Sequence, residues 1–349
     1  MRILVVQTAF AGDVLLTVPL LRALRSLPGT DRLAALVTPA GAAVLETQTL
    51  VDEFIIYDKR GGDRGSRGLV RVARALRSFG PDAAVVPHRS FRSALLSFLS
   101  GAGRRIGFRT SGGRVLLTDV LPYDAGRHEV ERVASLAGPL GSSGAVTPVP
   151  FSLEVPDAGR NEVADLLSST GVAQGARVVS AAPGSRWATK RWPPERFAAA
   201  LTELAARLDA APVLIGSADD AAAASEVLGA AERDVVDLTG RLTVAGWLAL
   251  VERSAVLLSN DSAAQHVAAG VGTPVVSVFG PTVPAQGFGP YGESGRVVEA
   301  ELACRPCGRH GAERCPVGTQ ECMRNVPVEA VVDAALALAA RRSSDRRRS

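Results

Sequence analysis

The stretch RILVVQTAFAGDVLLTVPLLRAL, residues 2–24, begins as an apolar strand and passes through a loop of small residues into an amphipathic helix. Gly12 and Asp13 stand where the loop becomes the helix. A strand that is apolar throughout is typical of a parallel sheet covered by helices on both faces. Ligands of open α/β sheets bind beyond the carboxyl ends of the strands, so the pattern predicts that Asp13 lies at a ligand-binding edge.

The same alternation of short apolar strands and helical patterns continues along the chain. Strands are expected near residues 2–6, 33–38, 54–57, 83–87, 104–107, 177–182, 212–216, 234–238, 256–259 and 274–279. Helices are expected near residues 14–27, 41–47, 67–79, 91–100, 127–140, 194–208, 219–230, 243–253, 262–270 and 327–341. This order predicts an α/β protein with two Rossmann-like, doubly wound parallel-sheet domains that face a cleft.

The length of 349 residues and the apolar content of 47% are sufficient for two domain cores. We expect an N-terminal domain at residues 1–150, a linker rich in Gly, Ser and Pro at 151–176, and a C-terminal domain at 177–341. The basic tail at 342–349 is expected to be disordered. No apolar run approaches the roughly 18 residues of a spanning helix, and the start does not resemble a signal peptide, so a cytoplasmic protein is predicted.

The basic residues are distributed unevenly. Residues 59–114 contain thirteen Lys and Arg but only two acidic residues, Asp63 and Asp82. Such a segment attracts nucleic acid, a phospholipid surface, or a phosphorylated or carboxylated substrate. For any one of these arginines a solvated surface position is the plain alternative. Neither half has a clean G-x-G-x-x-G after its first strand, which argues against a dinucleotide dehydrogenase.

Two loops of the second half carry groups that bind anions. SAAPGSRWATKRWP, residues 180–193, leaves the first strand of that half and contains Ser185 and Lys190. In LLSNDSAAQHVAAGVGTPVVSVFGP, residues 257–281, Asn260-Asp261-Ser262 ends a strand and starts a helix with a first turn of small residues. Free backbone N–H groups and the helix dipole favour a phosphate there, which predicts a diphosphate site that needs no metal.

Each residue of this predicted site also has a plain structural interpretation. Asp261 or Ser262 could simply cap the helix, and a lone histidine such as His266 is more often a packing residue than a ligand. Asp13 could likewise be only an N-cap. The functional interpretation gains weight because the two anion-binding loops lie at the carboxyl ends of parallel strands.

Four blocks of the sequence together resemble a known family. They are GDVLLTVPLLRAL (12–24), APGSRWATKRWP (182–193), SNDSAAQHVAAGVGTPVVSVFGPT (259–282) and CRPCGRHGAERCPVGTQECMRNV (304–326). The chain resembles the ADP-heptose:lipopolysaccharide heptosyltransferases of glycosyltransferase family 9, heptosyltransferase II in particular, from Met1 to about Val331. The resemblance implies the GT-B architecture, with the nucleotide held by the C-terminal domain and the acceptor by the N-terminal domain. It also implies an inverting transfer with no metal or other cofactor in catalysis.

The resemblance assigns roles to individual residues. Asp13 matches the catalytic base, and Lys190 matches the lysine that meets the diphosphate. The expected donor-binding set is Ser185, Lys190, Asp220, Asp261, Ser262, Ala263 and His266. Asp220 corresponds to a ribose-binding acid, and the neighbouring Asp219 is an equal candidate. A carboxylate suits the role of base because proton transfer from the attacking hydroxyl can occur late in the reaction.

On the acceptor side the resemblance implies a lipid-anchored, anionic glycan. The candidates to bind it are Arg89, Arg92, His128 and Arg132. For Arg132 the alternative is an ion pair with Glu129, three residues earlier on the same helix, and no contact with the acceptor. The helix at 67–79 places several arginines on one stripe, which suits either an anionic lipid surface or an ordinary amphipathic helix. We therefore expect an ADP-sugar donor, a glycolipid acceptor, contact with the cytoplasmic face of the inner membrane, and no nucleic acid.

The four cysteines fall close together, at Cys304, Cys307, Cys315 and Cys322. Four thiolates at short spacing suit one structural zinc, and free buried thiols are the alternative. Two other functions are compatible with a sugar-nucleotide pocket: a GT-B-fold sugar-nucleotide epimerase and a non-catalytic binding protein. The epimerase would require further acids, bases or histidines, and the chain has only four histidines.

Overall fold

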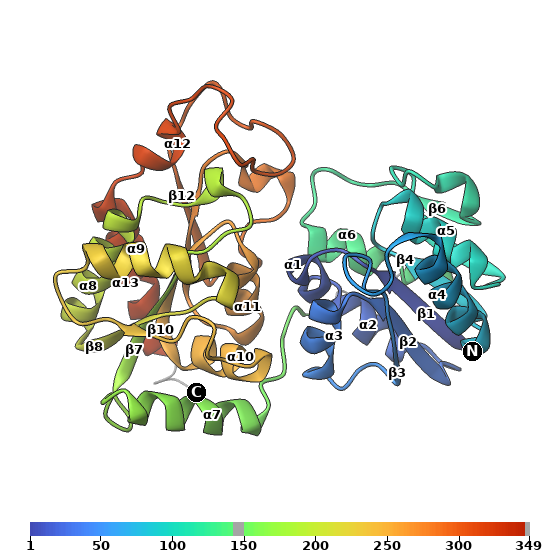
Figure 1. Ribbon diagram of the computed structural model, residues 1–349, viewed down its shortest axis with the longest axis horizontal. Helices are drawn as coiled ribbons and strands as arrows, with labels where there is room; N and C mark the ends of the chain where they lie inside the picture. The colour runs from blue at the N-terminus through green and yellow to red at the C-terminus, as the bar shows by residue number, and fades with distance from the viewer. Residues whose placement is uncertain (142–149, 346–349) are drawn as a thin grey trace. The chain divides into compact units, whose positions relative to one another are not determined.

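The computed structural model describes residues 1–141 and 150–345. It divides into two units, Met1–Ser152 and Leu153–Ser349. Each unit contains a six-stranded, wholly parallel sheet with helices on both faces (Figure 1). The predicted α/β class with two doubly wound sheets is therefore confirmed. None of the helices in the described residues is long and apolar enough to cross a membrane.

The first unit has the strand order β3-β2-β1-β4-β5-β6. Its strands are β1 (Arg2–Gln7), β2 (Arg32–Val37), β3 (Glu53–Ile56), β4 (Ala83–Val86), β5 (Arg104–Phe108) and β6 (Asp119–Leu121). Its helices are α1 (Ala11–Leu15), α2 (Val18–Arg25), α3 (Pro39–Glu46), α4 (Gly65–Phe79), α5 (Phe91–Leu99) and α6 (Glu129–Ser135), with the 3-10 turns η1 (Arg114–Leu116) and η2 (Gly138–Leu140). The single helix expected at 14–27 is two helices, because Pro19 has no N–H to continue the first.

The second unit has the strand order β12-β11-β10-β7-β8-β9. Its strands are β7 (Arg177–Ala182), β8 (Ala210–Leu214), β9 (Val236–Asp237), β10 (Ser254–Asn260), β11 (Val275–Phe279) and β12 (Gly295–Glu299). Its helices are α7 (Asp157–Ser169), α8 (Pro194–Leu208), α9 (Ala221–Ala230), α10 (Val244–Arg253), α11 (Ala263–Val271), α12 (Glu321–Arg324) and α13 (Val328–Asp345), with the 3-10 turns η3 (Ala188–Lys190), η4 (Ala218–Asp220) and η5 (Pro284–Gln286).

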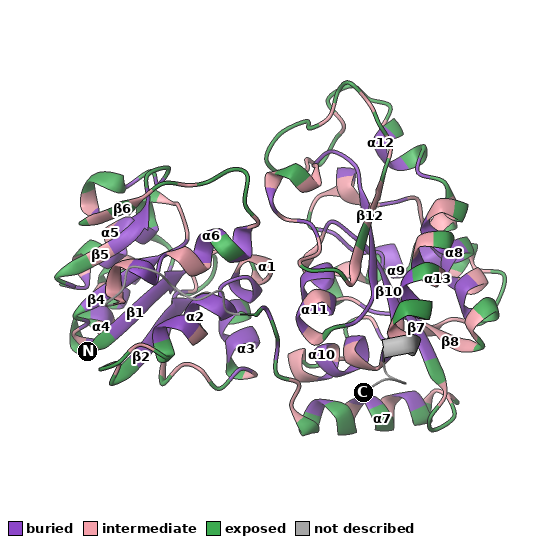
Figure 2. Cartoon of the chain, turned by 180° about the vertical axis from the view of Figure 1, so that it is seen from behind, coloured by how far each residue is buried: buried purple, intermediate pink, exposed green. Residues whose placement is uncertain are grey.

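In both sheets the strand order reverses between the first and the fourth strand of the unit. The first strand of each unit has the second strand on one side and the fourth on the other, so β1 neighbours β4 and β7 neighbours β10. The strands at these centres are buried (Figure 2). Ligands of doubly wound sheets bind at such a reversal point, beyond the carboxyl ends of the strands. Each unit therefore offers one binding edge, at β1/β4 and at β7/β10.

Two expectations about the ends of the domains need correction. The segment expected to be a linker, residues 151–176, contains α7, whose Gly159 packs so closely on α10 that a Cβ there would lie 2.2 Å from the Ala245 carbonyl oxygen. The expected disorder at 342–349 is wrong for its first residues, because α13 continues to Asp345 and Arg342 donates to the Ser254 carbonyl at 2.6 Å. Residues 346–349 lie outside the described part of the chain.

Candidate active site

The reversal point of the second sheet brings the two predicted anion-binding loops together. Lys190, in η3 after β7, forms an ion pair with Asp261, which directly follows β10. The side chains are only 12% and 9% exposed. An ammonium group has three donors, so Lys190 can hold Asp261 and still bind an anionic ligand.

Both oxygens of the Asp261 carboxylate accept hydrogen bonds from neighbouring side chains. The Thr282 hydroxyl donates to Oδ2 at 2.6 Å, and the Gln265 amide donates to Oδ1 at 3.0 Å. Gln265 is fully buried and also donates to the Phe288 carbonyl at 3.2 Å. These partners orient the carboxylate that holds Lys190. The sequence did not single out Thr282 or Gln265.

The loop between β7 and α8 is closed by one buried side chain. The Asn260 amide donates to the Pro183 carbonyl at 2.7 Å, and its oxygen accepts from the Trp192 N–H at 2.9 Å. Between Pro183 and Trp192, the Ser185 backbone carbonyl accepts two hydrogen bonds from the Arg191 guanidinium, at 2.9 and 3.1 Å. Both ends of the loop that carries Lys190 are thus tied to the end of β10.

The start of α11 lies beside the ion pair. Ser262 is the N-cap residue, but its side chain makes no capping hydrogen bond and instead lies 3.1 Å from the Ser259 hydroxyl. The first N–H groups of α11, from Ala263 onward, are therefore not capped by a side chain, and the dipole there favours an anion. His266, one turn further along α11, is 5% exposed. The plain alternative, in which the side chain of Asp261 or Ser262 only caps this helix, is therefore wrong: Ser262 makes no capping bond, and Asp261 is held by other side chains.

Asp220 has a structural role that the sequence did not reveal. Its carboxylate accepts from the Ser217 N–H at 2.9 Å and from the Ser217 hydroxyl at 2.8 Å, which closes a capping box at the start of η4. The same carboxylate packs on Gly184 of the loop after β7, where a Cβ would lie 2.0 Å from Oδ1. Asp220 is thus adjacent to the Lys190 loop, and Asp219 is exposed. Ribose binding by either residue stays a prediction.

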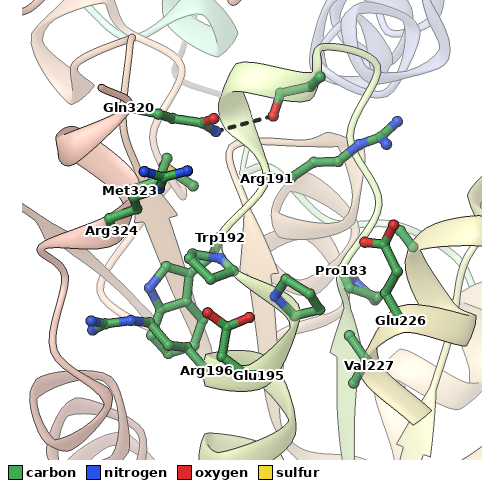
Figure 3. A pocket seen from close by; sticks show the side chains of 14 residues that line it. Pro183, Arg191, Trp192, Glu195, Arg196, Glu226, Val227, Gln320, Met323 and Arg324 are labelled. Carbon is green, nitrogen blue, oxygen red and sulfur yellow. Dashed lines mark hydrogen bonds between the residues drawn. The ribbon is translucent and has the colours of Figure 1, made fainter. Parts of the chain in front are cut away.

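A cavity of about 570 Å³ lies beside this loop, between the start of α8, α9 and α12 (Figure 3). Trp192 and Pro183 line it together with Val227 of α9, and Gln320 donates to the Ala188 carbonyl at 3.3 Å. None of the predicted donor-binding residues lines this cavity. The cavity is therefore separate from the predicted diphosphate site.

In the first unit Asp13 lies just beyond the carboxyl end of β1, as predicted. It is half-buried and occupies the first turn of α1, whose N-cap is Phe10. The alternative that Asp13 is itself the N-cap is therefore wrong. The Asp13 carbonyl accepts from the Thr17 hydroxyl at 2.9 Å, which holds the backbone of this turn.

The sequence missed a polar cluster at the β1/β4 reversal point. The His88 Nδ1 atom lies 3.1 Å from the Thr8 hydroxyl and 2.9 Å from the Ser93 hydroxyl, and Lys59 donates to the Thr8 carbonyl at 2.6 Å. Burial, with smaller effects from Lys59 and Arg89, lowers the pKa of His88 to about 4. Burial also lowers the pKa of Lys59. His88 is neutral at physiological pH, and the local positive charge comes from lysine and arginine.

The four predicted acceptor residues divide into two pairs. Arg92 is exposed, and the Arg89 guanidinium lies over the Tyr123 ring, 4.0 Å from its centroid. Arg132, by contrast, is 3% exposed and donates to the Glu129 carboxylate at 2.9 Å. The alternative pairing of Glu129 with Arg132 is confirmed. The Arg132 guanidinium thus bonds to residues of the first unit itself.

The other side chains of this region support the same interpretation. The Tyr123 hydroxyl accepts from Arg132 at 2.6 Å and donates to Glu129 at 2.6 Å, and burial followed by Glu129 raises its pKa to about 12. His128 is the N-cap of α6 and accepts from the Val130 N–H at 3.2 Å. His128 and Arg132 therefore stabilise α6 and its preceding turn.

The cysteine-rich segment packs on the Lys190 loop. Thr189 donates to the Ala312 carbonyl at 2.8 Å and accepts from the Ala312 N–H at 2.8 Å. Cys304 and Cys307 are exposed, Cys315 is half-buried and Cys322 is buried, all as free thiols. Across residues 1–141 and 150–345, no three His, Cys, Asp or Glu side chains are placed to share a metal ion. The structural zinc stays a prediction.

Comparisons with known proteins agree on one family. The model of glycosyltransferase family 9 (heptosyltransferase) matches residues 69–315. The chain is 28% identical over 296 residues to lipopolysaccharide heptosyltransferase 2 of Salmonella typhimurium, covering 81% of this chain and 84% of that protein.

Two solved structures extend the likeness to the whole fold. A glycosyltransferase family 9 protein of Veillonella parvula is 25% identical, with a TM-score of 0.84 over 97% of each chain. The ADP-heptose lps heptosyltransferase II of E. coli is 24% identical, with a TM-score of 0.77 over 98% of this chain and 100% of that chain. The chain therefore belongs to glycosyltransferase family 9 (heptosyltransferase) and is a glycosyltransferase of the GT-B fold.

Proposed function

We propose that this enzyme transfers a heptose or a related sugar from an ADP-activated donor to a lipopolysaccharide core or similar glycan, with inversion at the anomeric carbon. Family membership and the names of its relatives support this donor and acceptor. The observation that carries the proposal is the buried Lys190–Asp261 pair at the β7/β10 reversal point. It provides an oriented cation where doubly wound sheets bind ligands.

In this proposal the second unit holds the donor diphosphate. Lys190 and the first N–H groups of α11 meet the phosphate oxygens, with Ser185, Ser262 and His266 around them. As the bond between the sugar and the diphosphate breaks, negative charge grows on the leaving oxygen. Donors that are already oriented stabilise this charge without reorganisation, which is usually the largest contribution to catalysis. No metal or other cofactor is proposed in catalysis.

The first unit holds the acceptor in this proposal. An acceptor hydroxyl attacks the anomeric carbon from the face opposite the diphosphate and loses its proton to the Asp13 carboxylate. The new glycosidic bond forms as the bond to the diphosphate breaks, so the configuration inverts. Lys59, Arg89 and Arg92 make this edge suitable for phosphate and carboxylate groups of the acceptor. We place the reaction in the cytoplasm, at the inner face of the inner membrane.

A transfer assay tests the proposal directly. The purified protein is incubated with ADP-heptose, with and without a lipopolysaccharide core acceptor, and ADP and the glycosylated product are measured. We expect ADP release that depends on the acceptor, and a product of anomeric configuration opposite to that of the donor. Failure to transfer from a panel of ADP-, GDP- and UDP-sugars would exclude the proposed activity, and retention would exclude the inverting mechanism.

A further inference from the structure

The outward face of α5 is apolar. Phe91 is 56% exposed and Phe98 is 49% exposed, and Leu95 between them is only partly buried. Positions i, i+4 and i+7 lie on one side of a helix, so these three side chains form one stripe. Leu96, on the opposite side of α5, is buried in the core of the first unit. A helix that covers a sheet normally presents polar residues to water, whereas the exposed side of α5 carries two aromatic rings besides Arg92.

The turn η1 extends the same apolar surface. Val115 is 83% exposed in this turn. The turn packs directly on α5, because a Cβ at Gly113 would lie 2.6 Å from the Ala94 Cβ and 3.3 Å from the Phe91 carbonyl oxygen. We use the name α5 face for Phe91, Leu95, Phe98 and Val115. Contiguous exposed apolar residues of this kind mark interaction sites on soluble domains.

Three arginines adjoin the α5 face: Arg92 in α5, Arg105 beside Phe98, and Arg114 at the start of η1. Residues 87–121 contain six arginines and a single acidic residue, Asp119, which already pairs with Arg104 at 2.6 Å. The arginines are Arg89, Arg92, Arg104, Arg105, Arg109 and Arg114. The Arg105 guanidinium lies 5.5 Å from the centroid of the Phe98 ring, and Arg92 and Arg114 are exposed. Apolar side chains beside cationic ones are complementary to an anionic lipid surface.

We propose that the α5 face docks on an anionic phospholipid bilayer. The inference rests on the proposed function, because the acceptor of that reaction is anchored in a membrane. α5 follows directly on the turn that carries His88 and Arg89 at the acceptor edge. Insertion of Phe91 and Phe98 among the lipids would thus bring that edge close to membrane-anchored glycans.

The structure favours this surface over the helix that the sequence indicated. In α4, Val72, Leu76 and Phe79 are buried against the sheet, as in an ordinary amphipathic helix. Arg71 of the expected basic stripe is bound to Asp63, with its Nε 2.7 Å from Oδ1. Among the large apolar residues of α4, only Val70 is strongly exposed, at 47%. α4 therefore lacks the aromatic side chains that α5 presents.

Vesicle co-sedimentation of the full-length protein, without donor or acceptor, tests the proposal. The vesicles are phosphatidylglycerol mixed with phosphatidylcholine, and phosphatidylcholine alone. We expect binding to the anionic vesicles, weakened by salt, and at least about tenfold weaker binding for the Phe91→Ser/Phe98→Ser variant, since burial of two aromatic rings is lost. The matched control is Val317→Ser, which alters an apolar residue that is 59% exposed in the second unit and should bind like the wild type.

Three results would overturn the proposal: no wild-type binding to anionic vesicles, equal binding by the double variant, or a wild-type dimer that the double variant converts to a monomer. Vesicle binding is measured in the absence of donor and acceptor, so it does not depend on catalysis. A protein that binds anionic vesicles but transfers no sugar would contradict the proposed function and leave membrane docking supported. Transfer to a deacylated, water-soluble acceptor measures the catalytic activity without any need for membrane binding. The double variant should keep that activity and lose at least about tenfold of its rate on acceptor embedded in vesicles.

Discussion

Asp13 is the residue on which the proposed chemistry depends. Asp13→Asn removes the base but keeps the size and shape of the side chain. We expect kcat to fall about 100-fold or more, because general base catalysis contributes about that much. The affinity for ADP should not change, since ADP is proposed to bind the second unit.

Steady-state kinetics and ADP titration calorimetry measure the two effects. Glu46→Gln, an exposed residue at the end of α3, is the matched control and should leave both unchanged. Near-normal kcat in Asp13→Asn would remove Asp13 from the mechanism.

His88 makes the stability of the protein depend on pH. Its pKa is about 4 in the folded protein, against an ordinary value of 6.5. Between these values the unfolded chain binds a proton that the folded chain does not, so the free energy of unfolding falls as the pH falls through this window. The full difference is about 3 kcal/mol.

Urea unfolding at pH 7 and pH 4.5 measures this effect. His88→Gln should reduce the loss of stability between the two pH values, because the replacement cannot titrate. His310→Gln changes an exposed histidine and should show the same loss as the wild type. An undiminished loss in His88→Gln would show that other groups cause it.

At the scale of elements, the cysteine-rich segment positions the Lys190 loop. Gly311 lies against that loop, where a Cβ would come within 2.7 Å of the Trp187 Cβ and 2.9 Å of the Lys190 Cγ. Gly311→Ala should displace Lys190 and raise KM for the donor several-fold, with a smaller effect on kcat.

Donor kinetics and thermal unfolding together test this role. The matched control is Gly229→Ala in α9, where no atom lies within 4 Å of the new Cβ. That substitution should leave KM unchanged and should, if anything, stabilise the fold slightly, because alanine suits a helix better than glycine. A Gly311→Ala enzyme with unchanged KM would contradict the positioning role.

Elemental analysis of the purified protein tests the predicted zinc. One zinc per chain, with no thiols that react rapidly, would support a site at Cys304, Cys307, Cys315 and Cys322. Four titratable thiols and no zinc would contradict it. Because Cys322 is buried, all four thiols are counted in the unfolded protein.

The sequence predicted the central elements well because they are apolar throughout. The strands that it missed, β6 and β12, lie at the edges of their sheets and are only partly buried, so they lack a continuous apolar run. The helix α7 was missed because it follows a region rich in Gly, Ser and Pro. Periodicity reports burial, and these elements are only partly buried.

The same limit applies to the site. Lys190 and Asp261 could be predicted to meet because each follows a strand beside the reversal point. The partners of Asp261, Thr282 and Gln265, could not be predicted, because their hydrogen bonds depend on how separate segments pack. Arg132 shows the same limit: the sequence left open whether it meets a ligand or pairs with Glu129, and its burial beside Glu129 depends on how the unit packs. Acceptor binding by Arg132 stays a prediction.

At the scale of the whole molecule, each unit has its own sheet and its own core. Such units often unfold separately, so calorimetry should resolve two transitions. ADP at about 100 times its Kd should stabilise the unit that binds it by about 2.7 kcal/mol and raise only one transition temperature. A single transition, or an equal shift of both, would contradict separate unfolding with nucleotide bound by the second unit alone.

The double hydrogen bond of Asn260 has a consequence for how ligands are captured. One amide joins the carbonyl of Pro183 to the N–H of Trp192, so the fold itself restricts the segment between them. The conformational entropy of that segment is lost once, during folding, and ligand capture does not have to restrict it again. Association should therefore proceed as docking onto a nearly rigid surface, with little change in heat capacity beyond that of the area covered.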